Sequence, residues 1–248
     1  MAKRRRLVVG NWKMYGRLTS GLVLARELAD KIAAKKPLNF DIAVCPPATL
    51  TWPVSEAIMG SPLLLGAQDC HHATHGAYTG DVSAAMFADL GCRYVILGHS
   101  ERRLAHQETN ELISKKVAAA QLAGLTTIVC VGETEEQRTS AKTVEVIEQQ
   151  LRASLPEKNQ IAQLVVAYEP VWAIGSGQQP EIKDIESVHQ TIRKALGAAG
   201  EAVQVIYGGS VTPQNAGSIL ENQEVDGVLV GSASINGDGF WAIAEKCR

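Results

Sequence analysis

The chain has 248 residues, 46% of them hydrophobic, and a formal net charge of −2. This apolar content is enough for one large core, and an α/β barrel commonly uses about 250 residues as one domain. The near-zero charge excludes an electrostatic footprint for nucleic acid or an acidic membrane, and no apolar run reaches the ~18–20 residues that span a bilayer. We therefore expect one domain over residues 1–248, with neither nucleic acid nor membrane as a partner.

The chain opens on a basic run, Lys3 to Arg6, which predicts a solvated tail because no apolar signal segment follows it. Eight short apolar, β-branched runs then recur and predict buried strands. They span residues 7–10, 42–45, 63–67, 94–97, 127–131, 164–168, 203–207 and 227–230.

A stretch with helical spacing follows each predicted strand. In the first stretch, Leu18, Leu22, Ala25 and Leu28 recur as one helix face. The later helices are predicted near 54–59, 84–90, 108–123, 143–154, from Pro180 to about 198, from Thr212-Pro213 onward, and near 239–246.

These eight strand–helix units run on without a linker or a shift in composition. Strands that are apolar on both faces suit a parallel sheet covered by helices, and the helices supply the crossovers that parallel strands need. Eight such units close into a barrel, so the sequence predicts an α/β fold with eight parallel strands surrounded by helices. An open doubly wound sheet is the alternative, but no Gly-x-Gly-x-x-Gly turn follows any predicted strand.

Cysteines and histidines give no sign of a metal centre or a disulfide framework. The five cysteines are odd in number and form no Cys-x-x-Cys pair, which favours reduced thiols in a cytoplasmic protein. His71, His72 and His75 share a Gly- and Thr-rich loop without a clear fourth ligand, so we expect no metal there. Cys130 is expected to be a small buried residue rather than a nucleophile.

Candidate catalytic residues follow three separate strands, at the barrel end where such residues gather. Lys13 could hold an anion, His99 could polarise a carbonyl, and Glu169 ends an apolar strand whose burial tends to raise a carboxyl pKa toward that of a useful base. Each residue alone has an ordinary explanation: a surface lysine, a structural histidine, an acid that starts a loop. Together they predict proton abstraction next to a carbonyl. Glu101 is expected to pair with Lys13 or the nearby arginines and ranks second to Glu169 as a base.

The last two strands end in turns of small residues. Strand seven ends in Gly208-Gly209-Ser210 and strand eight in Gly231-Ser232, where main-chain N–H groups can approach an anion closely. These positions predict a phosphate site, since loops after strands seven and eight commonly bind phosphate in such barrels. The loop from Val171 to Gly177 has an apolar tip and two glycines, which predicts a mobile lid that excludes water.

These segments closely resemble the triosephosphate isomerase family, over essentially the whole chain. The resemblance is carried, in order, by residues 11–13, 76–80, 96–103, 130–134, 167–175 and 207–211. It implies a TIM barrel that needs no cofactor, takes a small triose phosphate as substrate, acts in glycolysis and gluconeogenesis, and forms a homodimer. In that dimer the loop Gln68–Gly80 would insert into the neighbour, with Thr79 near the other subunit's Asn11 and Lys13.

The resemblance also implies a role for each site residue. Glu169 would shuttle the proton, neutral His99 would act at the carbonyl oxygens, Lys13 would supply positive charge and Asn11 would position the substrate; the family is the type example of this glutamate–histidine pairing. Main-chain N–H groups of four residues would bind the phosphate: Gly175, Ser210, Gly231 and Ser232. Two departures stand out, because the family often has Gly-Gly at 231–232 and Lys-Thr-Ala where this chain has Gln178-Gln179-Pro180. We expect the lid rates to differ but the chemistry to survive.

Two other functions are compatible with a barrel. One is another phosphosugar barrel enzyme, such as an isomerase of longer aminosugars or an aldolase. The aldolase would need a Schiff-base lysine deep in a strand or a metal cluster, and the sequence shows neither. A non-catalytic scaffold would not need Glu169 and His99 placed with Lys13.

Overall fold

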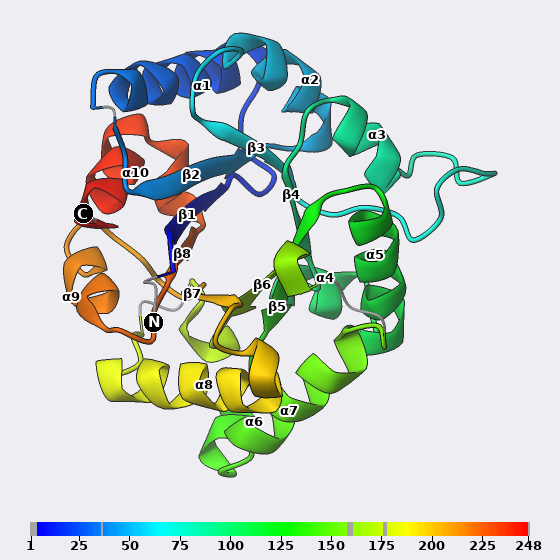
Figure 1. Cartoon of the computed structure of the whole chain (residues 1–248), viewed down its shortest axis with the longest axis vertical. Coiled ribbons are helices and arrows are strands. Elements are labelled where there is room, and N and C mark those ends of the chain that lie inside the picture. Colours follow the sequence, from blue (N-terminus) through cyan, green and yellow to red (C-terminus); the bar gives the residue numbers. More distant parts are fainter. Residues whose placement is uncertain (1–3, 36, 158–160, 176–177, 248) are drawn as a thin grey trace.

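The eight strands form a closed, all-parallel barrel in the order of the sequence (Figure 1). The computed structural model describes residues 4–35, 37–157, 161–175 and 178–247. The barrel closes where β1 pairs with β8, from Leu7 opposite Gly227 to Gly10 opposite Val230. The strands are β1 (Arg6–Asn11), β2 (Phe40–Cys45), β3 (Leu64–Ala67), β4 (Tyr94–Leu97), β5 (Thr126–Val131), β6 (Leu164–Tyr168), β7 (Gln204–Tyr207) and β8 (Gly227–Val230). The predicted (β/α)8 barrel is confirmed.

Helices surround the barrel and cover the outer face of the sheet (Figure 1). They are α1 (Leu18–Ala33), α2 (Ala48–Ala57), α3 (Ala84–Asp89), α4 (Ser100–Ala105), α5 (Asn110–Leu122), α6 (Glu135–Thr139), α7 (Thr143–Ser154), α8 (Ile182–Ala195), α9 (Ala216–Glu221) and α10 (Gly237–Ala244). Short 3-10 turns occur at Ile161–Gln163, Val171–Ala173, Gly197–Ala199, Ser232–Ile235 and Glu245–Cys247. Within the described residues, no helix is both long and apolar enough to cross a membrane.

The strands are apolar on both faces because the molecule has two cores. Alternate side chains of a strand point to opposite faces of the sheet. In β1, Leu7 and Val9 face the barrel interior with Ile96 and Ile206, whereas Val8 joins the larger core between the sheet and the helices. This two-sided burial stabilises the barrel and leaves side chains free to carry chemistry only where the strands end.

Several helix predictions were wrong in their limits. In α1, Leu18 is exposed and the buried face runs through Leu24, Ala25 and Leu28 instead. Helix α2 begins at Ala48, directly after Pro47, and contains Pro53, so the helix predicted from Val54 is longer than expected. The helix after β7 begins at 216, not at 212, and the helix of residues 108–123 begins at 110.

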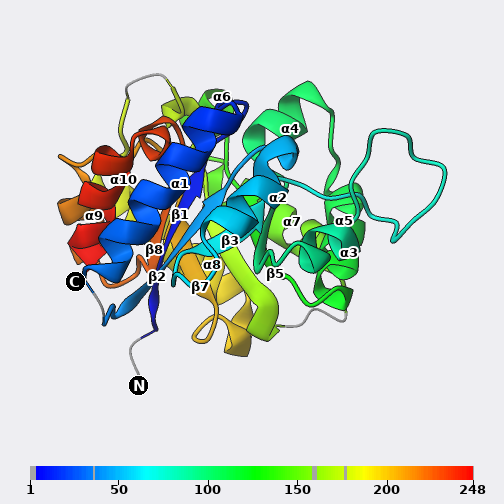
Figure 2. The ribbon, with the colours of Figure 1, turned by 90° about the horizontal axis from the view of Figure 1, so that it is seen from above.

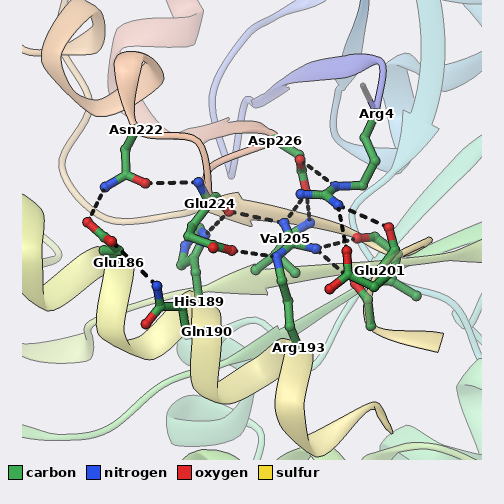
Figure 3. A network of polar contacts seen from close by, with 12 residues as sticks. Arg4, Glu186, His189, Gln190, Arg193, Glu201, Val205, Asn222, Glu224 and Asp226 are labelled. Carbon is green, nitrogen blue, oxygen red and sulfur yellow. Dashed lines mark hydrogen bonds and ion pairs between the residues drawn. The ribbon is translucent and has the colours of Figure 1, made fainter. Parts of the chain in front are cut away.

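Of the basic start, Lys3 lies outside the described residues, and Arg4 and Arg5 are not part of the solvated tail that the sequence predicts. Arg4 Nε donates to Asp226 Oδ1 at 2.7 Å, and Arg5 Nε donates to Asp41 Oδ1 at 2.7 Å. Figure 3 shows that Asp226 also accepts from buried Arg193, at 2.6 Å, and Arg193 Nε contacts Glu224 Oε2 at 2.8 Å. The Arg4–Asp226 pair joins the segment before β1 to the segment before β8, where the barrel closes, and the Arg5–Asp41 pair joins it to β2.

One long loop departs from the compact outline. The segment between β3 and α3, residues 68–83, projects sideways from the barrel (Figure 2). His71 and Tyr78 stack within it, with ring centroids 4.1 Å apart, and His72 lies 4.2 Å from His71. The predicted interface loop is therefore held in a defined shape by its own aromatic side chains.

Candidate active site

All eight residues predicted for the site line one cavity of about 540 Å³. They reach it from the ends of five strands: Asn11, Lys13, His99, Glu169, Gly175, Ser210, Gly231 and Ser232. The cavity lies at the carboxyl ends of the strands, as expected for this architecture. Three lining residues that the sequence prediction missed are Tyr15, Thr212 and Leu229. Leu229 belongs to the barrel interior, and no local pattern distinguished it from its neighbours in β8.

Lys13 has a backbone conformation that is unusual for a residue with a side chain. Its φ is 51°, in the left-handed region, and its N–H donates to Asn11 Oδ1 at 3.0 Å. Its ammonium contacts Glu101 Oε1 at 2.6 Å, which confirms the predicted pairing. Glu101 is therefore already paired and half-exposed, and is the weaker candidate for a base.

His99 is a buried imidazole at the start of α4. Its Nδ1 accepts the backbone N–H of Glu101 at 3.2 Å, so the neutral ring carries its proton on Nε2. Nε2 lies 3.0 Å from Glu169 Oε1. The ring thus presents an N–H toward the carboxylate and the cavity, while its other nitrogen is fixed by main chain.

Glu169 is almost completely buried and has one free oxygen. Oε2 accepts the backbone N–H of Ser100 at 2.9 Å. Oε1 approaches His99 Nε2 but has no well-aligned hydrogen-bond donor among the described residues. Position 208 beside Glu169 has room only for glycine, because an added Cβ there would lie 2.9 Å from Glu169 Cγ. Oε1, which contacts His99 and not the main chain, is the atom placed to accept a proton from a ligand.

The expectation that the Glu169 pKa is raised is wrong. Burial does oppose the charged form, but contact with His99, the Ser100 N–H and the Lys13 charge outweigh it and lower the Glu169 pKa. Burial is the largest influence on His99 and lowers its pKa, but the Glu169 and Glu101 carboxylates together outweigh it and raise the pKa. The carboxylate is thus ionised and ready to act as a base without any special rise in pKa.

The two turns predicted to bind phosphate both line the cavity, the first beginning at Gly208 beside Glu169. Gly231 lies against Lys13, since an added Cβ there would come 3.2 Å from Lys13 Cε. The Ser234 hydroxyl lies within hydrogen-bond distance of the Gly231 carbonyl, at 2.7 Å, and of the Asn11 carbonyl, at 3.2 Å. The last turn is thereby joined to the end of β1, next to the only lysine that lines this cavity in the described part of the chain.

The loop after Glu169 is divided between two environments. Ile174 lines the cavity, whereas Trp172 is half-buried on the other side. Trp172 Nε1 donates to buried Glu133 Oε1 at 2.9 Å, and the Arg138 guanidinium stacks 4.5 Å above the Trp172 ring. Ser176 and Gly177 of the predicted lid lie outside the described residues.

The remaining candidate residues have structural surroundings. Cys130 is buried at the end of β5, and burial raises the pKa of its thiol well above the usual value. His71 Nδ1 accepts the backbone N–H of Ala73 at 3.1 Å. Throughout the described ranges, no three His, Cys, Asp or Glu side chains form a group that could hold a metal ion.

A closed barrel that brings a carboxylate, an imidazole and an ammonium to one cavity defines a (β/α)8-barrel enzyme built for proton transfer. The profile of the triosephosphate isomerase family matches residues 6–247. Triosephosphate isomerases of Afipia carboxidovorans and Granulibacter bethesdensis are 48% and 47% identical, covering 99% and 97% of this chain and 98% of each relative. The chain therefore belongs to the triosephosphate isomerase family. The crystal structure of the Bartonella henselae enzyme superimposes with a TM-score of 0.90 at 38% identity, covering 98% of this chain and 99% of that one.

Proposed function

We propose that this chain interconverts dihydroxyacetone phosphate and D-glyceraldehyde 3-phosphate, in glycolysis and gluconeogenesis, with Glu169, His99, Lys13 and Asn11 as the catalytic residues. The observation that supports these roles best is that the Glu169 carboxylate and the His99 imidazole meet in one cavity. Glu169 Oε1 lacks a donor, and His99 Nε2 lies 3.0 Å from it without good alignment. The carbonyl oxygen of a substrate in the cavity beside them would receive the N–H of His99, while Glu169 takes the neighbouring carbon-bound proton.

The carbon-bound proton is transferred in two steps, first from C1 to Glu169 and then from Glu169 to C2. Glu169 Oε1 removes a proton from C1 of the ketose, the C–H electron pair forms a C1–C2 double bond, and negative charge develops on the C2 oxygen. His99 Nε2–H stabilises that charge, and the Lys13 ammonium favours it electrostatically. The proton of the C1 hydroxyl passes to the C2 oxygen by way of His99 Nε2, and Glu169 returns its proton to C2 while an electron pair of the C1 oxygen forms the aldehyde carbonyl. The Asn11 side chain, already fixed by the Lys13 N–H at 3.0 Å, orients the two oxygens.

Phosphate binding completes the proposal. Gly175, Ser210, Gly231 and Ser232 line the cavity. Their main-chain N–H groups would hold the phosphate. Ile174 of the loop after β6 would close over the bound substrate and exclude water. Serine at 232 leaves main-chain donation intact, so it does not weaken this assignment.

A coupled assay with glyceraldehyde 3-phosphate tests the function. We expect rapid turnover after exhaustive dialysis against a chelator, and competitive inhibition by inorganic phosphate. Solvent deuterium should enter the product, because the abstracted proton resides on a carboxylate that can exchange with water. Absence of turnover with this substrate, or appearance only with added metal, would contradict the proposal and favour an aldolase.

We further propose that the chain, a single domain over residues 1–248, works as a homodimer in the cytoplasm. The loop Gln68–Gly80 projects from the barrel, and a second cavity of about 280 Å³ lies beside the active site. That cavity is lined by Asn11, Lys13 and Met14, and Met14 is 95% exposed in the single chain. An apolar side chain exposed next to a catalytic lysine is unfavourable unless a partner covers it.

Light scattering at micromolar concentration tests the dimer. We expect twice the chain mass for the wild type and a shift toward monomer when Tyr78, half-exposed on the projecting loop, is replaced in Tyr78→Asp. Glu136→Lys, an exposed change on α6, is the matched control and should leave the mass unchanged. A monomeric wild type with full activity would overturn the assembly without touching the isomerase assignment.

A further inference from the structure

The strained backbone of Lys13 must be held by its surroundings. With φ at 51°, Lys13 occupies a region that disfavours residues with a Cβ, and such a conformation persists only where neighbouring groups impose it. Asn11 Oδ1 accepts the Lys13 N–H, which fixes one side of the residue. The ion pair with Glu101 contributes little restraint, because Glu101 is half-exposed and exposed ion pairs are weak.

The other side of Lys13 is held by a side chain from a different strand. Gln68 follows β3, and its Nε2 donates to the Lys13 carbonyl at 2.8 Å and to the Cys45 carbonyl at 2.9 Å. An amide NH2 has two hydrogens, so one group serves both carbonyls. Its orientation follows from the partners, since a flipped amide would place Oε1 against two carbonyl oxygens. One side chain thus joins the ends of β1, β2 and β3.

We propose that Gln68 is a positioning residue for the reaction, which holds the Lys13 ammonium over the substrate by fixing the Lys13 backbone. This inference rests on the proposed isomerase function. Without the two amide bonds, Lys13 can leave the left-handed region, and its ammonium then shifts relative to His99 and Glu169. Misplacement by about 1 Å can cost about 100-fold in rate, so an intermediate loss is expected from a partly relaxed backbone.

Gln68→Met tests the proposal, because methionine keeps the length of the side chain and removes both donors. Gln204→Met is the matched control, since Gln204 Nε2 donates to the Arg5 carbonyl at the opposite end of the barrel. We expect kcat/KM to fall at least about 10-fold in Gln68→Met, with KM for glyceraldehyde 3-phosphate and the inhibition constant of inorganic phosphate rising together. The two variants should have similar Tm values. Equal activity in both variants would overturn the positioning role.

Gln68→Glu provides an independent test should Gln68→Met fold poorly. The ionised carboxylate has no donor and would repel both carbonyls, whereas the protonated carboxyl has one O–H donor. The kcat/KM of Gln68→Glu relative to wild type should therefore recover as the pH falls from 8 to about 5, because a partly buried carboxyl held against two carbonyl oxygens becomes protonated as the pH falls. A ratio that does not change with pH would contradict the proposal.

Two further measurements distinguish the positioning role of Gln68 from an effect on dimerisation and from a failure of the proposed function. Light scattering at the assay concentration reports the oligomeric state, because Gln68 also begins the loop proposed to contact a partner. A loss of activity that disappears once the variant is concentrated enough to dimerise would overturn direct positioning of Lys13. An inactive wild type would contradict the proposed function itself, whereas an active wild type with an unaffected Gln68→Met would contradict only the role of Gln68.

Discussion

Acid should lower the free energy of unfolding through His189, a histidine that is fully buried. His189 lies on α8, is fully buried, and its Nδ1 contacts the Glu224 carbonyl at 3.0 Å. Because a carbonyl can only accept, Nδ1 carries the proton of the neutral ring, and Nε2 has no hydrogen-bond partner among the described residues. A second proton on Nε2 would give the ring a buried positive charge, and no acceptor among the described residues lies near the new N–H. Burial accordingly lowers the pKa of His189 to about 4.

The size of the effect follows from linkage. The unfolded chain has an ordinary histidine pKa of about 6.5, so between pH 6.5 and 4 it binds a proton that the folded chain does not. The contribution of His189 to the free energy of unfolding is therefore fully present above about pH 6.5 and is lost as the pH falls toward 4. At about 1.4 kcal/mol per pH unit, the loss amounts to about 3 kcal/mol.

The assay compares wild type with His189→Gln by urea unfolding at pH 7 and pH 4.5, at one fixed protein concentration. Glutamine can keep the N–H bond to the Glu224 carbonyl but does not titrate. We expect the variant to be less stable than wild type at pH 7, and the wild type to lose about 2–3 kcal/mol more than the variant between the two pH values. Parallel losses in the two proteins would refute the reasoning, because other titrating groups affect both alike.

Two other substitutions and one treatment test the packing and charge arguments. Gly132→Ala should unfold the site and destabilise the chain by more than about 2 kcal/mol, because its Cβ would lie 1.7 Å from the Glu169 carbonyl oxygen; Gly217→Ala on α9, with open space around it, should be tolerated. Arg4→Met should lower the free energy of unfolding by about 1–2 kcal/mol by leaving a buried carboxylate in Figure 3 with one partner fewer, whereas Arg26→Met, exposed on α1, should change it little. Unfolding by denaturant measures both pairs. Raising the salt concentration should weaken inhibition by inorganic phosphate, and a salt-independent inhibition constant would argue against an ionic role for Lys13.

The strands and the barrel could be predicted because buried strands produce continuous apolar runs in the sequence. A strand covered on both faces needs continuous apolar residues, and each such run was visible between turns. Helix α7 was equally clear, since its apolar face repeats over three turns. Helices α4 and α6 were missed because they bury almost nothing: α6 has no buried residue, and only its Thr134–Gln137 capping box marks its start.

Site residues could be predicted where the topology of the barrel alone fixes their position. They could not be predicted where the position depends on specific contacts between side chains. The end of a strand in a closed barrel is enough to bring Lys13, His99 and Glu169 together. Neither the pairing of Arg4 with Asp226 nor the contact of Gln68 with Lys13 follows from the spacing of residues in the sequence, because each joins residues next to different strands of the barrel. The Glu169 pKa was misjudged for the same reason, since its neighbours outweigh its burial.

The assignment of Glu169 as the base is tested most directly by the turnover of Glu169→Asp. The shorter side chain withdraws the carboxylate by about 1.5 Å, one C–C bond length, while keeping its charge. We predict that kcat falls at least about 100-fold with an unchanged circular dichroism spectrum, whereas Glu136→Asp on α6 retains wild-type turnover. Near-normal turnover in the folded Glu169→Asp protein would show that the proton passes through another group.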